Sequence, residues 1–364
     1  MMRQQNRDDQ LSRRTLLRGA AGLGLAAAAG TLLAGCSSGG GDKVETRAAG
    51  TKPGVQPPPE TTTIRLDNIF PVSCIAAQVM AEPFLREEGF TDIQYIKASP
   101  TAIASGLAAG DLDFSMGFGA LMTVPIDAGA PIVMLGGVHV GCWQLFGTKD
   151  IKSIRDFKGK TISISGPTGP DGLFAAVTLA NVGLDVRKDV KLVNHPPAEG
   201  LQLFSSGQVD GLVAFPPGSQ GLRAKGIGRV VVDSMSDRPW SDYFCCTANV
   251  NRNWMEKHPV ATKRALRALY RGADATAKDP ERAARVMVDG GFTDNYQYSV
   301  ENLKEIPYDV WREYDPADTI RFYALRLKEA GFIKSTPKQI LERGTDFSYL
   351  AELKQELKEA GHPR

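Results

Sequence analysis

Residues 152–163 have the sequence KSIRDFKGKTIS, which predicts a short helix that runs directly into a β-strand. Short apolar runs alternate with helical patterns both before and after this segment, from Thr61 onward. Such alternation is typical of α/β proteins. The segment therefore opens a second α/β unit, after a first one that precedes it in the chain.

The two predicted units are interleaved in the chain. Strands are expected at 63–66, 93–96, 114–116, 131–135, 142–146, 191–193, 211–215, 229–232 and 244–250, and helices at 74–88, 101–109, 120–127, 170–182, 198–206 and 219–225, followed by a mostly helical segment from Pro259. This connectivity predicts one lobe from 61–147 plus 240–364 and a second lobe from 150–238. An inserted lobe requires two crossing strands, and two crossing strands make a hinge.

Several short segments occur in a characteristic order and spacing: IRDFKGK at 154–160, GL at 183–184, KDV at 188–190, GQVDG at 207–211 leading to FP at 215–216, and MEKHP at 255–259. Together they resemble the nitrate/sulfonate/taurine class of ABC-importer solute-binding proteins. The resemblance implies a two-lobed, type II periplasmic-binding fold with a helical C-terminal segment. It also implies an extracytoplasmic monomer that captures a small organic solute, of the nitrate, sulfonate, taurine or thiamine-precursor class, and delivers it to an ABC permease.

The N-terminus predicts export and lipid anchoring. Residues 12–18, SRRTLLR, resemble the twin-arginine consensus, and residues 33–36, LAGC, resemble a lipobox. We therefore expect residues 1–35 to be a signal peptide, Cys36 to carry a lipid on the outer face of the cell membrane, and residues 36–60 to be a tether. The alternative is a plain transmembrane anchor in which LAGC occurs by chance.

Composition excludes several classes of function. A formal charge of +2, from 43 basic and 41 acidic residues, is too small to attract and bind the phosphate backbone of a nucleic acid. Five cysteines in 364 residues are too few for a disulfide scaffold. We expect Cys74, Cys142, Cys245 and Cys246 to be thiols that serve as small buried apolar groups. The four histidines show no metal-ligand spacing, so no metal and no cofactor is predicted.

The predicted binding site follows from the fold class. Ligands of open α/β sheets bind beyond the carboxyl ends of the strands, and this rule selects the loops 68–73, 116–120, 166–171 and 195–199. The candidate ligand-binding residues are Asn68, Phe70, Ser73, Gly117, Phe118, Gly119, Thr168, Gly169, Asp171, His195 and Phe215. Asp171 is equally consistent with a first-turn helix acid, and His195 with a hydrogen-bonding group at a strand end.

None of these four loops contains Lys or Arg, which favours a neutral or weakly basic organic solute over a strong anion. Candidate stacking faces are Phe70, Phe118, Trp143, Phe215 and Trp240. Core packing is the alternative for each ring, and we expect two or three of them to face the solute.

Two other functional classes remain open at this stage. Thiamine-pyrimidine synthases share this fold and carry a longer cysteine run before a comparable helix, which Cys245 and Cys246 resemble in part. The chain shows neither an evident iron-binding histidine set nor a nucleophile–base pair, so we expect a binding protein and not an enzyme. A purely structural surface lipoprotein is the third class, and it would have no need of a hinged body.

Overall fold

The structure, a computed structural model, describes residues 57–359. The predicted signal peptide, Cys36 and most of the predicted tether lie outside these residues. The end of the predicted tether is part of the folded body, because both carboxylate oxygens of Glu60 accept hydrogen bonds of 2.9 Å from the backbone N–H groups of Val260 and Ala261. These two groups lie in the first turn of helix α9 (Pro259–Lys278), where a carboxylate is favourable.

The first sheet has the strand order β2-β1-β3-β10-β4. Its strands are β1 (Thr63–Asn68), β2 (Asp92–Lys97), β3 (Phe114–Phe118), β4 (Ile132–His139) and β10 (Cys246–Asn251). Strand β1 pairs in parallel with β2 and β3, whereas β10 runs antiparallel to both β3 and β4. Strands β3 and β4 are buried at every position, as expected for the centre of an α/β lobe.

The second sheet repeats this plan with the order β7-β6-β8-β5-β9. Its strands are β5 (Gln144–Gly147), β6 (Thr161–Ile164), β7 (Lys191–Asn194), β8 (Gly211–Ala214) and β9 (Arg229–Asp233). Strand β6 is parallel to β7 and β8, and β5 is antiparallel to β8 and β9. Strand β5, which the predicted division placed at the end of the first lobe, belongs to the second sheet because β8 and β9 pair with its two edges.

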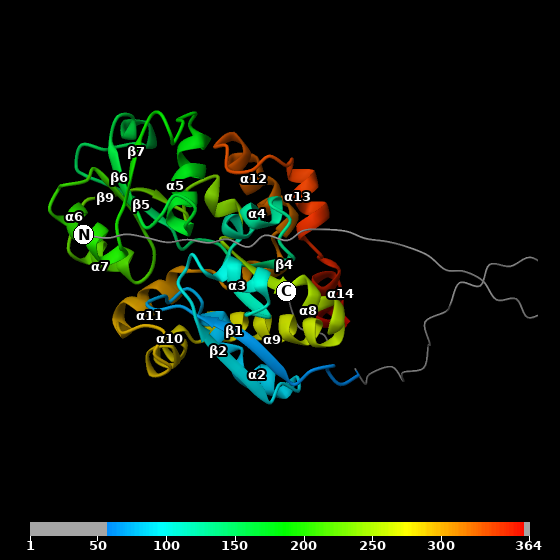
Figure 1. Ribbon diagram of the computed structural model, residues 1–364. Helices are drawn as coiled ribbons and strands as arrows, with labels where there is room; N and C mark the ends of the chain where they lie inside the picture. Colours follow the sequence, from blue (N-terminus) through cyan, green and yellow to red (C-terminus); the bar gives the residue numbers. More distant parts are fainter. Residues whose placement is uncertain (1–56, 360–364) are drawn as a thin grey trace, which may run out of the picture. The chain divides into compact units, whose positions relative to one another are not determined.

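The chain crosses between the sheets twice. The first crossing, residues 140–143, leads from β4 to β5, and the second, residues 234–245, leads from β9 to β10. Each sheet with the helices packed on it forms a lobe, and the second lobe is the mostly green one in Figure 1. The predicted α/β class and two-lobed architecture are therefore confirmed.

Helices cover both sheets. In chain order they are α1 (Ala76–Met80), α2 (Glu82–Glu87), α3 (Ile103–Ala109), α4 (Gly119–Asp127), α5 (Pro170–Asn181), α6 (Pro197–Ser205), α7 (Gly218–Ala224), α8 (Arg252–Lys257), α9, α10 (Pro280–Asp289), α11 (Tyr296–Glu305), α12 (Pro316–Glu329), α13 (Pro337–Gly344) and α14 (Ser348–Glu359). Short 3₁₀ turns lie at Ile154–Phe157, Trp240–Asp242 and Val310–Arg312. The predicted helix 74–88 is divided at Ala81, because Pro83 has no backbone N–H to continue the ladder.

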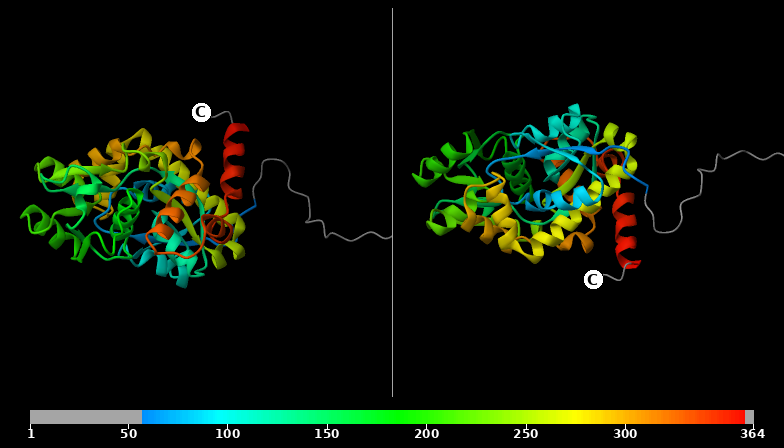
Figure 2. Two further views of the ribbon diagram at one scale, coloured as in Figure 1. Left: turned by 90° about the horizontal axis from the view of Figure 1, so that it is seen from above. Right: turned by 90° about the horizontal axis from the view of Figure 1, so that it is seen from below.

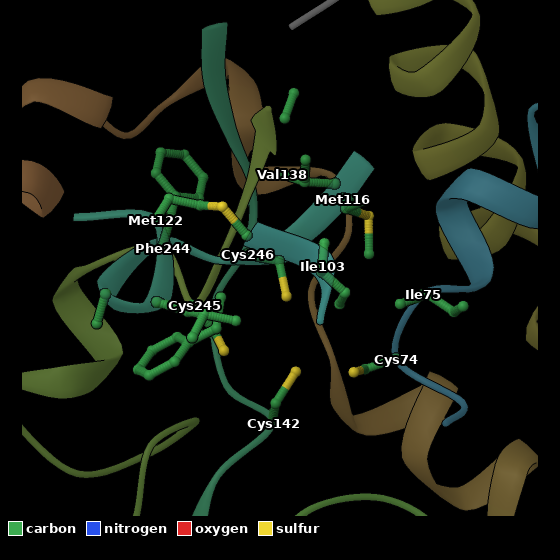
Figure 3. Packing of buried hydrophobic residues seen from close by; sticks show 14 of the residues in the cluster. Cys74, Ile75, Ile103, Met116, Met122, Val138, Cys142, Phe244, Cys245 and Cys246 are labelled. Carbon is green, nitrogen blue, oxygen red and sulfur yellow. The ribbon is translucent and has the colours of Figure 1, made fainter. Parts of the chain in front are cut away.

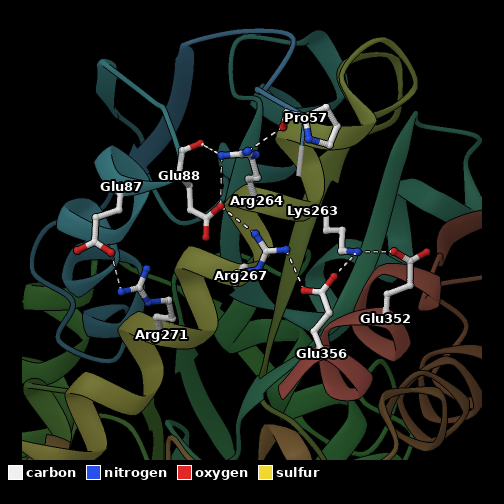
Figure 4. A network of polar contacts seen from close by, with 9 residues as sticks. All are labelled: Pro57, Glu87, Glu88, Lys263, Arg264, Arg267, Arg271, Glu352 and Glu356. Atoms are coloured by element: carbon white, nitrogen blue, oxygen red, sulfur yellow. Dashed lines mark hydrogen bonds and ion pairs between the residues drawn. The ribbon is translucent and has the colours of Figure 1, made fainter. Parts of the chain in front are cut away.

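The helical C-terminal segment packs against the first lobe. Figure 2 shows α14 at the end of the body remote from the second lobe. An ion-pair network fixes α14 to α9, in which Lys263 contacts Glu352 and Glu356 at 2.6 and 2.7 Å and Arg267 joins Glu356 to Glu88 (Figure 4). In the described part of the chain, no helix combines the length and the apolar character that a membrane span requires.

Candidate functional site

Two adjoining cavities lie between the lobes, lined by residues at or just beyond the carboxyl ends of strands from both sheets. The small cavity has a volume of about 60 Å³, and the large cavity has about 490 Å³. They share Val72, Pro100 and Phe215 as lining residues. The large cavity falls in the usual size range of small-molecule sites.

An aromatic cluster forms one wall of the small cavity. Trp143, from the first crossing, lies 5.5 Å from Phe118 and 5.4 Å from Phe215 between ring centroids. Its ring also stacks on Phe174 of α5 at 5.9 Å. The crossing thus places one indole between aromatic residues of both lobes, and three of the predicted stacking residues lie here together.

The other two predicted stacking residues lie elsewhere. Phe70 is 56% exposed and lines the large cavity, whereas Trp240 is buried and lines neither cavity. Among the remaining candidates, Gly117 lines the small cavity, and Asp171 and His195 line the large one.

Five predicted site residues line neither cavity; they are Asn68, Ser73, Gly119, Thr168 and Gly169. The hydroxyl of Ser73 is buried and accepts a hydrogen bond of 3.0 Å from the Asn302 side chain. The backbone carbonyl of Asn68 accepts a hydrogen bond from Ala98. Thr168 is exposed, while Gly169 is buried at the start of α5. Ser73 and Asn68 therefore hold the cleft loops in place.

Asp171 and His195 have structural partners within the second lobe. Asp171 accepts hydrogen bonds from the Ser165 hydroxyl at 2.7 Å and from the backbone of Gly172 at 2.9 Å. Burial raises its pKa, although these hydrogen bonds oppose the shift. The His195 ring lies 3.1 Å from the Ser163 hydroxyl. Both residues thus take the structural roles weighed above while also lining the large cavity.

Four cysteine side chains also line the small cavity, a feature that the sequence patterns did not reveal. Cys74 follows β1, Cys142 lies in the first crossing, and Cys245 and Cys246 lie where the second crossing enters β10. All four are buried and free of disulfides, as expected. The sulfur atoms of Cys74, Cys142 and Cys246 lie within 4.8 Å of one another and point toward a common centre (Figure 3).

The thiols change one another's ionisation. Burial opposes the ionisation of Cys245, but hydrogen bonds with the Cys142 and Cys246 thiols outweigh it and lower its pKa to about 7. Burial also acts to lower the pKa of His139, whose ring nitrogens lie 4.0 Å from the Cys142 sulfur, but Cys246 raises it to about 9. The cluster therefore favours the thiolate form of Cys245 and Cys246, whereas burial and the neighbouring thiols raise the pKa values of Cys74 and Cys142.

The helix N-termini beside the small cavity offer little to an anion. Helix α5 begins with Pro170, which has no N–H, and the Asp171 carboxylate already accepts the Gly172 N–H. At the start of α4, the Gly119 N–H donates to the Cys245 carbonyl. An anion would therefore have to displace an internal acceptor at either helix.

The large cavity is similarly poor in positive charge. Lys225 is its one Lys or Arg lining residue within the described chain, and it shares the lining with Asp171 and Asp294. Pro197, the first residue of helix α6, lines the cavity, and Glu199 lies in the first turn of the same helix. A nearby negative charge in the first turn again disfavours an anionic ligand.

Ion pairs bridge the two lobes beside the large cavity. Arg223 of α7 contacts Glu301 and Glu305 of α11, each at 2.7 Å. Helix α11 also supplies Tyr298 to the cavity wall, and Asn295 at its N-cap lines the cavity too. Sequence reasoning missed these residues because they lie in the helical segment, far from the loops that follow the strands. Asn295 can be recognised in the sequence as an N-cap residue, but an N-cap indicates the start of a helix and not a binding cleft.

Two α/β lobes, two crossings and a cavity between the lobes define a periplasmic-binding-protein fold. Residues 57–288 match the model of the NMT1-like family, and the chain belongs to that family. The predicted relationship to solute-binding proteins is confirmed at the level of the fold and the family.

Individual relatives agree with this assignment. The nitrate/nitrite binding protein NrtA of Nostoc sp. is 26% identical over 282 residues, which are 68% of this chain and 63% of that protein, so less than two thirds of the relative is covered. The periplasmic nitrate-binding protein NrtA from Synechocystis superposes with a TM-score of 0.69 at 17% identity, covering 82% of this chain and 90% of that one. The aliphatic sulphonate binding protein SsuA from Escherichia coli superposes with a TM-score of 0.62 at 16% sequence identity, covering 78% of this chain and 92% of that one.

Proposed function

We propose that this protein is the extracytoplasmic receptor of an ABC importer, and that it binds a small neutral or weakly basic organic solute between its lobes. The family, the two-lobed fold and the binding roles of NrtA and SsuA support the receptor role. The LAGC motif at 33–36 supports a lipid anchor at Cys36, and SRRTLLR at 12–18 supports twin-arginine export. The expected partner is a permease that docks on both lobes of a monomer.

The observation that carries the choice of solute is the lining of the small cavity. Apart from the four cysteines, none of the described residues that line it is ionisable, and aromatic rings, aliphatic side chains and sulfur atoms form its surface. An anion moved into such a site loses its hydration and finds no Lys or Arg partner. A planar, uncharged solute gains ring contacts with Trp143 and Phe215 instead.

Closure of the lobes supplies the mechanism of capture. The crossings at 140–143 and 234–245 carry Trp143 and Cys245, so hinge bending moves cavity residues relative to one another. The Arg223 pairs with Glu301 and Glu305 join the two lobes, and they favour a closed state of the cleft. A solute that contacts both lobes shifts the population toward this closed state, and the permease receives it when the lobes open again.

Isothermal titration calorimetry with two solute panels tests the proposal. We expect uncharged heterocycles to bind and nitrate, taurine and alkanesulfonates not to bind, with closure on binding visible by small-angle scattering. Phe215→Ala is expected to weaken heterocycle binding, since the ring lines both cavities. The matched control is Phe322→Ala, which removes a half-buried ring stacked on Tyr243 outside both cavities. Tight binding of nitrate or a sulfonate without any heterocycle binding would contradict the proposed solute class.

A further inference from the structure

The described part of the chain contains four cysteines, and all four meet at one place. They come from three segments that are distant in sequence, namely the loop after β1, the first crossing, and the junction between the second crossing and β10. Cysteines that served only as small apolar groups would have no reason to gather, since any buried position satisfies that role. Their convergence therefore calls for a chemical explanation.

The geometry matches the needs of a thiophilic metal ion. The sulfur atoms of Cys74, Cys142 and Cys246 lie within 4.8 Å of one another. With metal–sulfur bonds of about 2.3 Å, three sulfurs around a planar ion would be separated by about 4.0 Å. A contraction of less than about 1 Å in any pair, within reach of side-chain rotation, closes the shell.

The backbone supports this arrangement at Cys142. This residue has φ of +93° and follows Gly141 at +86°. A residue with a Cβ atom rarely occupies the left-handed region, and such conformations persist where the surroundings require them. Here the conformation belongs to the segment that presents the Cys142 sulfur to the other two (Figure 3).

We propose that Cys74, Cys142 and Cys246 form a three-sulfur site for a soft monovalent ion, and that copper(I) is the ion it fits. Thiolates select soft ions, and the cavity offers no carboxylate that would favour magnesium, calcium or manganese. Structural zinc takes four ligands, whereas three sulfurs form the mutually close group here.

This site goes beyond the proposed receptor function and does not rest on the identity of the solute. Binding releases thiol protons to solvent as sulfur–metal bonds form. The bound ion would join the loop after β1 to the first crossing and to the start of β10, directly after the second crossing; the crossings are the segments that bend when the lobes open.

Titration of the full chain with copper(I), under anaerobic conditions and in competition with bathocuproine disulfonate, tests the site. We expect one ion per chain, with about three sulfur neighbours near 2.3 Å by X-ray absorption spectroscopy. Cys74→Ala and Cys142→Ala should each weaken binding by at least about 100-fold, the upper end of the effect of losing an outer-shell partner. Cys245→Ala is the comparison variant, because it removes a buried sulfur that contacts two of the ligands but lies outside the group of three, and it should weaken copper binding less than Cys74→Ala or Cys142→Ala does.

Three results would overturn the inference. They are copper(I) retention no tighter than that of glutathione, retention unchanged in Cys74→Ala, or stronger retention of zinc with four sulfur neighbours. Circular dichroism reports whether each variant is folded. If the alanine variants fail to fold, X-ray absorption spectroscopy of the copper-loaded wild-type chain tests the site by itself. A copper ion with fewer than three sulfur neighbours would contradict the proposed site.

Discussion

Asp67 gives a sharp test of how burial controls the stability of the first lobe. Its side chain on β1 is fully buried, and one carboxylate oxygen accepts a long hydrogen bond of 3.4 Å from the Gln78 amide. The other oxygen, Oδ2, has no hydrogen-bond partner among the described residues. Burial raises the pKa of Asp67 from its ordinary value of 3.8 to about 6, against smaller opposing effects of Ser115 and Gln78.

The sign and size of the effect follow from linkage. Because the folded state holds the Asp67 proton more tightly than the unfolded chain does, protonation stabilises the fold. This contribution is fully present below about pH 4 and is lost as the pH rises through about 6. A shift of about two pKa units corresponds to about 3 kcal/mol of unfolding free energy.

Urea denaturation between pH 4 and pH 8 measures the effect. Replacing Asp67 with asparagine keeps the size of the side chain and removes its titration, so the variant should lack this loss of about 3 kcal/mol. Asp92→Asn is the control, since it removes an exposed carboxylate from the neighbouring strand β2 and should leave the loss in place. If Asp67→Asn shows the same pH dependence as the wild-type chain, the reasoning is refuted.

Three further substitutions test packing, a buried hydrogen bond and lobe closure. Gly272→Ala should destabilise the fold by about 3 kcal/mol in chemical denaturation, because its Cβ would overlap the backbone of Ala77 and Ala81. Gly218→Ala faces open space and should change stability by less than about 1 kcal/mol. Asp274→Ala leaves the indole N–H of the buried Trp311 without its acceptor and should cost about 1–3 kcal/mol in thermal denaturation. Arg223→Gln removes the interlobe ion pairs and should enlarge the solute-free protein in small-angle scattering; an unchanged radius would show that these pairs do not hold the lobes together.

The order of helices and strands could be predicted because local patterns control it. The apolar strand that follows Gly159 and the helix that begins at Pro170 both appear where the sequence places them. The prediction of one helix over 74–88 was wrong, since the segment forms two helices. The prediction followed the apolar periodicity of the segment and did not allow for the missing N–H of Pro83. The sheet that receives β5 was also misplaced, since strand pairing is decided by partners more than 60 residues away in the chain.

The cleft loops were predictable in part. A general rule about strand ends led to Phe118, Phe215, Asp171 and His195, all of which line a cavity. The same rule could not find Tyr298, because helix α11 reaches the cleft only through its packing against the rest of the first lobe. It also could not separate residues that face the cavity from those, such as Ser73, that support its loops.

The sequence by itself determined the alternation of strands and helices, the family resemblance and the balanced charge of the chain, because these depend on residues close together or on composition. Only the tertiary structure decided which side chains share the space between the lobes. The sulfur atoms of Cys74, Cys142 and Cys246 meet because two crossings and one strand end converge at the hinge. No spacing along the chain encodes that contact, since the lobe inserted between the crossings separates Cys142 from Cys246.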